Sequence, residues 1–292
     1  STQSLSRTLN QYEREKPFPT PLFIAVDQEG GRVQRCKEGF TILPPASDLI
    51  EREGESIRAL GAQLSKELRL AGVNMNFAPV VDVLNSESGV LQGRAISKDP
   101  SEVVRVAASL LEGYDSSNLI GVLKHFPGHG SVKGDSHFVM PIVEKTLIEM
   151  ENCDLLPYRE LIKKVDAIMM AHILVPALDP DNMVTFSKKW HRYLRGDLGF
   201  EGVIVSDSLT MKPVHDIAHT LEEGALRAIQ AGSDLLIIGG KTLEGHRTEF
   251  ISPSEIRRIV KYVVQRAEVD SDLKTRVEES YARIISLKRK KL

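Results

Sequence analysis

The sequence predicts an α/β fold, specifically a (β/α)8 barrel of the TIM type, from three observations. Short apolar runs with the character of buried strands recur along the chain, and helical patterns lie between them. This alternation indicates parallel βαβ units in one sheet. Nearly every apolar run also ends in polar residues. A barrel collects functional residues from many strand ends, whereas an open doubly wound sheet concentrates them at one point, so the barrel is favoured.

The predicted strands are the apolar runs at residues 22–26, 73–83, 119–123, 167–175, 203–205 and 235–238. A helix is predicted over 57–68, where leucine and isoleucine recur at helical spacing until Gly72. Another begins at Ser252, since Ser-Pro-Ser-Glu forms a capping box with proline at the first helical position. A third covers 273–285, and we interpret the basic residues 288–291 behind it as a solvated helix end.

We expect one domain over residues 1–292, because no linker, low-complexity segment or charge block divides the chain. Only six strands are clear, and residues 138–143 are either a poor strand or a loop. The first βα unit of the barrel is therefore expected to be missing from this chain, upstream of Ser1.

The composition excludes several classes of protein. A formal net charge of -2 and a pI near 6.5 give no reason to expect a nucleic-acid partner. The two cysteines show no spacing typical of a disulfide framework or a zinc site. No apolar stretch approaches the roughly 20 residues that span a bilayer, and no signal peptide opens the sequence. We expect a cytoplasmic monomer with no membrane partner, and export stays open because the N-terminus lacks methionine.

Polar residues cluster directly after the predicted strand at 119–123. Residues 124–130 read Lys-His-Phe-Pro-Gly-His-Gly, and Asp135 and His137 follow. Asp135 could orient an imidazole that exchanges protons near neutral pH. Alternatively, four side chains resemble a ligand set for zinc or another divalent ion: His125, His129, Asp135 and His137. Spacing alone does not separate these interpretations.

Other predicted strands also end in functional groups. Asp207 follows Val203-Ile204-Val205, where its carboxylate could act as a nucleophile, a metal ligand or the N-cap of the next helix. Three further polar residues end predicted strands: Asp27, Asp82 and His172. We interpret His172 as a structural or supporting residue and assign Glu29 no catalytic role.

Four motifs carry a resemblance to a known family. They are residues 26–35 (Val-Asp-Gln-Glu-Gly-Gly-Arg-Val-Gln-Arg), 76–83 (Asn-Phe-Ala-Pro-Val-Val-Asp-Val), 124–130 with 135–137, and 206–211 (Ser-Asp-Ser-Leu-Thr-Met). In this order, over residues 22–240, the sequence resembles bacterial β-N-acetylglucosaminidases of glycoside hydrolase family 3. The family often has Ser-Asp-Asp-Leu in the last motif, and here Ser208 replaces the second aspartate.

The resemblance implies a role for each matching residue. Asp207 is expected to be the nucleophile, with Asp135 and His137 as an acid/base dyad. The residues expected to bind the terminal N-acetylglucosamine are Asp27, Arg35, Arg94, Lys124 and His125. These enzymes need no metal, so the resemblance favours the acid/base interpretation, and no cofactor is expected.

The resemblance also implies a function. It predicts a retaining exo-β-N-acetylglucosaminidase that removes terminal N-acetylglucosamine from peptidoglycan fragments, such as N-acetylglucosaminyl-anhydromuramyl peptides, in cell-wall recycling. Three alternatives remain on the same fold: a phosphorylase that uses phosphate in place of water, a β-glucosidase, and an inactive muropeptide-binding protein.

Overall fold

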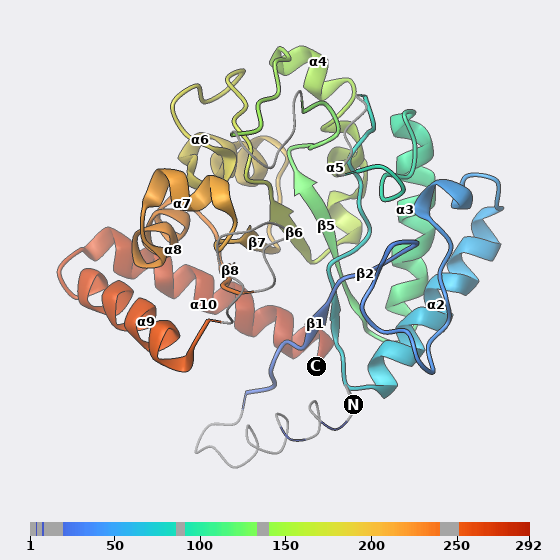
Figure 1. The fold of residues 1–292 in the computed structure, drawn as a ribbon, viewed down its shortest axis with the longest axis horizontal. Helices are drawn as coiled ribbons and strands as arrows, with labels where there is room; N and C mark the ends of the chain where they lie inside the picture. The colour runs from blue at the N-terminus through green and yellow to red at the C-terminus, as the bar shows by residue number, and fades with distance from the viewer. Residues whose placement is uncertain (1–3, 5–7, 9–19, 86–90, 133–139, 240–250) are drawn as a thin grey trace.

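Six parallel strands form the central sheet of the protein, and the sheet is curled (Figure 1). This computed structural model describes residues 4, 8, 20–85, 91–132, 140–239 and 251–292. The strands pair in chain order: β1 (Ala25–Val26), β4 (Met75–Asn76), β5 (Ile120–Phe126), β6 (Ala167–Met170), β7 (Val203–Ser208) and β8 (Leu235–Ile237). Each predicted strand is therefore confirmed in type and place. Closure into a ring of eight strands stays a prediction.

Four predicted strands are shorter in the structure than their apolar runs: β1, β4, β6 and β8. The run at 73–83 forms a strand only at β4, because Pro79 has no N–H group for a ladder of hydrogen bonds. Beyond it, Val80 bridges to Lys124, and the Val81 N–H donates to the Lys124 carbonyl over 2.9 Å. The end of this run thus continues alongside β5 and keeps Asp82 next to that strand. An antiparallel pair, β2 (Gln28–Gly30) and β3 (Val33–Gln34), follows β1 and was not predicted.

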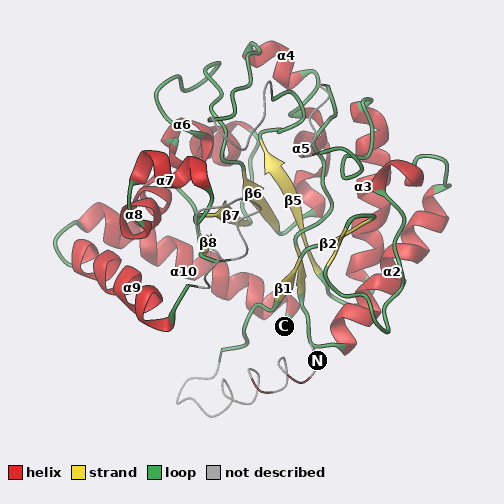
Figure 2. Ribbon diagram, viewed as in Figure 1, coloured by secondary structure: helices red, strands yellow, loops and turns green. Residues whose placement is uncertain are grey.

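Helices flank the sheet (Figure 2). The longer ones are α2 (Gly54–Leu70), α3 (Pro100–Asp115), α8 (Leu221–Ala231), α9 (Pro253–Ala267) and α10 (Ser271–Lys291). The shorter ones are η1 (Ala46–Leu49), α4 (Leu147–Glu151), α5 (Leu156–Leu161), η2 (Ile162–Lys164), η3 (Val184–Phe186), α6 (Lys188–Arg192), the π-helical turn η4 (Tyr193–Asp197) and α7 (Lys212–Ala218). The three helices predicted from sequence correspond to α2, α9 and α10. None of the described helices is long and apolar enough to cross a membrane.

The start of α9 confirms the capping box. The Glu255 N–H donates to Ser252 Oγ over 3.2 Å, and the Ser252 N–H donates to Glu255 Oε2 over 2.9 Å. These two bonds satisfy N–H groups that have no partner inside a helix. Local sequence is therefore enough to set where α9 begins.

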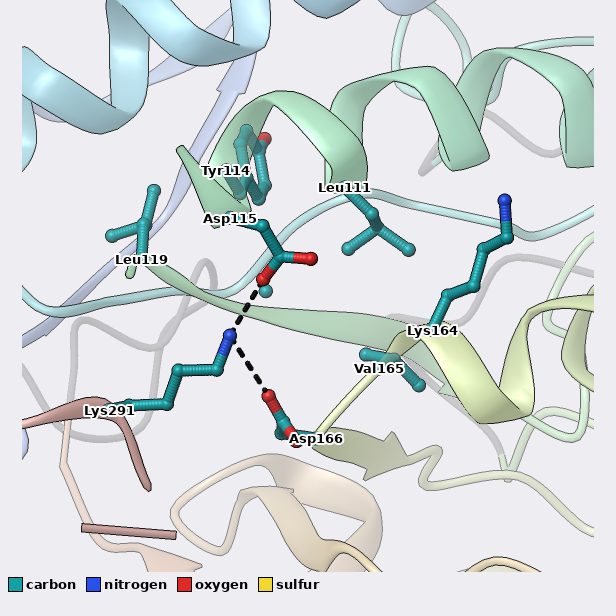
Figure 3. Close-up of a pocket in the computed structure, with 9 residues that line it drawn as sticks. Leu111, Tyr114, Asp115, Leu119, Lys164, Val165, Asp166 and Lys291 are labelled. Atoms are coloured by element: carbon teal, nitrogen blue, oxygen red, sulfur yellow. Dashed lines mark hydrogen bonds and ion pairs between the residues drawn. The ribbon is translucent and has the colours of Figure 1, made fainter. Parts of the chain in front are cut away.

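The basic end of α10 packs against the sheet instead of lying wholly in solvent. Figure 3 shows Lys291 between Asp115 and Asp166 in a small pocket at the amino ends of β5 and β6. Its Nζ lies 2.7 Å from Asp115 Oδ1 and 3.3 Å from Asp166 Oδ2, and the side chain is 9% exposed. The predicted solvated helix end is wrong for Lys291, because two acidic residues distant in sequence meet it there. Lys290 stays 65% exposed, although it also pairs with Asp166.

A buried carboxylate fastens α10 to the same end of the sheet. Asp234 directly precedes β8, and its side chain is fully buried. Its carboxylate accepts hydrogen bonds from Arg195 of η4 over 2.5 Å and from Ser280 of α10 over 2.9 Å. Arg276 and Arg283, also on α10, complete the set of ion pairs. One side chain thus joins β8, η4 and the C-terminal helix.

Replacing Asp234 with alanine should lower the free energy of unfolding by about 3–5 kcal/mol, because three arginines would lose their buried partner. Urea denaturation followed by circular dichroism measures this change. The exposed Asp197 offers a control, and Asp197→Ala should change stability by less than about 0.5 kcal/mol. Equal losses in both variants would contradict a special role for the Asp234 cluster.

Candidate active site

The candidate site lies at the carboxyl ends of the parallel strands. Asp27 directly follows β1, Lys124 and His125 lie near the end of β5, and Asp207 lies near the end of β7. His172 comes two residues after β6. Carboxyl ends of parallel strands meet at one edge, so residues far apart in sequence come together here.

A buried lysine lies at the centre of one half of the site. Lys124 Nζ lies 2.8 Å from Asp27 Oδ1 and 2.6 Å from Glu29 Oε1, and its side chain is only 2% exposed. Arg94 donates two hydrogen bonds to the same glutamate, from Nε and Nη2, each 2.8 Å from a carboxylate oxygen. Paired bonds of this kind fix the planar guanidinium in one orientation. The four side chains therefore form one rigid ionic cluster.

The charge of Glu29 is stabilised within this cluster. Burial acts to raise the pKa of Glu29, but the positive charges and hydrogen bonds of Lys124 and Arg94 outweigh it and lower the pKa to about 2. Glu29 is therefore ionised at neutral pH and keeps both cations paired. Asp27 has a half-exposed side chain and is the member of the cluster that solvent can reach.

A second buried carboxylate orients the two histidines of the Lys-His-Phe-Pro-Gly-His-Gly motif. Asp82 Oδ2 lies 2.7 Å from His125 Nδ1, and Asp82 Oδ1 accepts bonds from the backbone N–H groups of His125 (3.1 Å) and His129 (2.7 Å). Burial acts to raise the pKa of Asp82, but the charges and hydrogen bonds of His125 and His129 outweigh it and lower the pKa to about 2. Asp82 therefore holds the imidazole of His125 and the start of the following loop together.

Asp207 carries a negative charge among cationic or polar neighbours. Its Oδ1 accepts the backbone N–H of Ser208 over 2.6 Å. Burial acts to raise the pKa of Asp207, but the charges of His172, His125 and Lys124 and the Ser208 bond lower it overall. The carboxylate is therefore ionised at neutral pH, as a nucleophile must be.

Two glycines shape the loop that follows β5. Gly128 has a φ of 131°, and a Cβ there would lie 2.7 Å from Asp154 Cβ. A Cβ on Gly130 would lie 1.8 Å from the Val83 carbonyl oxygen. Neither position accepts a side chain, because the loop passes this close to its neighbours. These contacts fix the course of the chain up to Val132.

One buried aspartate contacts residues on both sides of segment 133–139. Asp154 Oδ1 accepts a hydrogen bond from Ser131 Oγ over 2.9 Å, and Oδ2 lies 2.5 Å from Lys145 Nζ. Burial raises the pKa of Asp154, although the bonds from Lys145 and Ser131 oppose the increase. Asp154 thus links the described residues that precede and follow the segment.

The structure brings together most of the predicted site residues that it describes. Asp27, Lys124 and Arg94 share one cluster, and the charges of Arg94, Lys124 and His125 all reach Asp207. Arg35 is exposed just after β3. Two predicted residues, Asp135 and His137, lie outside the described residues, so their roles stay predictions.

Sequence reasoning missed the partners that organise these residues. The sequence assigns Glu29 no catalytic role and does not identify its partners, whereas in the structure it joins Lys124 to Arg94. Asp82 was noticed only as the end of a strand, and no sequence signal identified Asp154 as a contact of the loop. Within the described part of the chain, no group of three or more histidine, cysteine or acidic residues is arranged to hold a metal ion. Half of the ligand set considered from sequence lies outside that part.

Residues 1–287 match the family described as "Glycosyl hydrolase family 3 N terminal domain". The beta-hexosaminidase of Idiomarina loihiensis is 42% identical to this chain over 224 residues, which is 75% of this chain and 67% of that protein. The beta-hexosaminidase of Nitrosospira multiformis is 41% identical over 227 residues, which is 75% of this chain and 64% of that protein. The chain thus spans about two thirds of these relatives.

A solved structure shows the same fold. The family 3 beta-N-acetylglucosaminidase from Paenibacillus sp. str. FPU-7 superposes with a TM-score of 0.88 at 32% identity. The superposition covers 99% of this chain and 54% of that protein. The fold of this chain therefore corresponds to about half of the Paenibacillus enzyme.

The lowered pKa of Glu29 predicts a pH-dependent loss of stability. Because the pKa falls from 4.5 to about 2 on folding, the charged form stabilises the protein above pH 4.5, and this contribution is lost as pH falls towards 2. The full contribution is about 3 kcal/mol. In Glu29→Gln, the free energy of unfolding should therefore change less steeply between pH 5 and 2.

Urea denaturation at several pH values tests this expectation. Glu51 is exposed, so Glu51→Gln is the control and should keep the wild-type pH dependence. If Glu29→Gln also kept the wild-type slope, the Lys124–Glu29–Arg94 cluster would not stabilise the charged carboxylate.

Proposed function

Because the chain belongs to glycosyl hydrolase family 3, we propose that it is a retaining exo-β-N-acetylglucosaminidase. The observation that carries the proposal is the ionised carboxylate of Asp207 at the end of β7, facing the charges of Lys124, His125 and Arg94. The two relatives named beta-hexosaminidase and the Paenibacillus beta-N-acetylglucosaminidase support the substrate class.

In the proposed mechanism, Asp207 attacks the anomeric carbon of the terminal sugar and the glycosidic bond breaks. His137 donates a proton to the departing oxygen, and a covalent glycosyl-Asp207 ester results. His137 then takes a proton from water, which attacks the same carbon and releases the sugar. Two inversions give net retention of configuration. Asp135 stabilises the imidazolium form of His137 in each cycle.

The polar groups around Asp207 suit recognition of sugar hydroxyls. Asp27 offers a reachable acceptor, and Lys124, Arg94 and His125 offer N–H donors held by buried carboxylates. Donors and acceptors fixed before the ligand arrives lose little entropy on binding. We therefore assign these four residues, with Arg35, to the terminal N-acetylglucosamine.

The biological substrate follows from the same proposal. We propose peptidoglycan fragments such as N-acetylglucosaminyl-anhydromuramyl peptides as substrates, in cell-wall recycling in the cytoplasm. We also propose that the six described strands belong to a (β/α)8 barrel. The chain-order pairing of the strands supports that topology.

Replacing Asp207 with asparagine should reduce kcat on an aryl N-acetyl-β-glucosaminide by on the order of 10³-fold or more, because an amide cannot form the covalent intermediate. Release of the chromophore measures the rate. Asp216 is an exposed aspartate on α7, so Asp216→Asn is a control that should keep wild-type activity. A fluorinated sugar fluoride should label the peptide that contains residue 207. A label on any other residue would overturn the mechanism.

Replacing His137 with alanine should affect substrates according to their leaving groups. A poor leaving group needs protonation, so the turnover of a substrate that carries one should fall by on the order of 10²–10⁴-fold. A dinitrophenyl leaving group departs without protonation, so the rate of the first step on that substrate should fall less. Added azide should form the glycosyl azide, since an anion needs no general base. The exposed His215 provides the control variant His215→Ala. Equal losses for both leaving groups would remove His137 from proton transfer.

A further inference from the structure

His172 makes two hydrogen bonds that fix its imidazole ring beside Asp207. Its Nε2 lies 3.0 Å from the Ser208 carbonyl oxygen, and its Nδ1 lies 2.7 Å from Thr185 Oγ1. A carbonyl oxygen only accepts hydrogen bonds, so Nε2 must carry the hydrogen. The chain itself therefore selects one tautomer of His172, with Nε2–H directed at the residue that follows Asp207.

Thr185 controls the other ring nitrogen. Thr185 lies in η3, is fully buried, and its hydroxyl also lies 2.8 Å from the Ala171 carbonyl oxygen. A hydroxyl has one hydrogen, which it can donate either to His172 Nδ1 or to Ala171. Burial lowers the pKa of His172 and so favours the neutral imidazole ring. In that neutral ring, Nδ1 carries no hydrogen and accepts the hydrogen bond from the Thr185 hydroxyl. Thr185 thus orients the ring through Nδ1, and the Nε2–H group donates to the Ser208 carbonyl.

Three hydrogen bonds hold Ser208 in place. Its carbonyl accepts the bond from His172, its hydroxyl donates to the Gly239 carbonyl over 2.6 Å, and its N–H donates to Asp207 Oδ1 over 2.6 Å. The backbone angles of Ser208 are therefore constrained from both neighbouring peptide groups. Any movement of Ser208 also moves the N–H that orients the carboxylate.

We propose that His172, oriented by Thr185, is a positioning residue that fixes Ser208 and thereby the carboxylate of Asp207 for attack on the sugar. This inference rests on the proposed function, in which Asp207 is the nucleophile. His172 acts through Ser208 and needs no contact with the substrate. Its loss affects the covalent step more than sugar binding, because misplacement of a reacting group by a fraction of an ångström reduces the rate steeply.

His172→Phe keeps the ring volume and removes both hydrogen bonds. The variant should lower kcat by about 10–100-fold while KM changes by less than about threefold. The rate of labelling by the fluorinated sugar should fall in parallel, since it reports attack by Asp207. His172→Gln retains an amide donor for Ser208 and should recover part of the activity.

Thr185 gives an independent pair of variants. Thr185→Val keeps the shape but removes the hydroxyl, so kcat should fall by about tenfold, whereas Thr185→Ser keeps the hydroxyl and should stay near wild type. Equal activity of the valine and serine variants would overturn the role of Thr185 in orienting His172.

His191 is a matched control for the loss of a buried histidine. It is also buried, and its ring bonds to the Ser187 carbonyl (2.9 Å) and to Ser233 Oγ (3.1 Å), but Ser233 precedes β8 at the opposite end of the sheet. His191→Phe should keep kcat for the folded protein, even if the thermal midpoint falls. The inference fails if His172→Phe keeps wild-type kcat and labelling rate, or if both phenylalanine variants lose kcat equally. Full activity of Asp207→Asn would instead refute the proposed function.

Discussion

The buried ion pair between Lys124 and Glu29 is the constraint on which the rest of the site depends. Lys124 is almost fully buried at the end of a strand whose residues are all buried, so its charge needs a partner within the protein. An unpaired ammonium at such a place would cost several kcal/mol. Glu29 supplies that partner and also holds Arg94. The strand end, the β2–β3 pair and the segment with Arg94 must therefore meet in one arrangement.

The same principle operates at Asp82. This carboxylate is buried and ionised, and it is stabilised by the imidazole of His125 and two backbone N–H groups. Removing these donors would leave a buried charge unsatisfied. The site is thus built from pairs in which a buried acid orients a base, and the solvent-accessible groups, such as Asp27, are positioned by those pairs.

The two ends of the sheet have different roles. At the amino ends of the strands, Asp234 and Lys291 join the C-terminal helix to the sheet through ion pairs. At the carboxyl ends, similar charges surround Asp207. Both ends contain buried ions, but among the described residues the carboxyl end brings together His125, His172 and the carboxylate of Asp207 from three neighbouring strands. This division is the one expected for a barrel enzyme, in which one face stabilises and the other reacts.

The sequence by itself determined the positions of the six strands, the start of α9 and the strand ends that carry polar residues. These features depend on neighbouring residues, because hydrophobic periodicity and capping are local. Only the tertiary structure decided which polar groups pair. Glu29 meets Arg94 across 65 positions and Asp82 meets His125 across 43, so no local pattern contains either contact. The burial of Lys291 and the bond from Thr185 to His172 were hidden for the same reason, since each depends on how separate elements pack together.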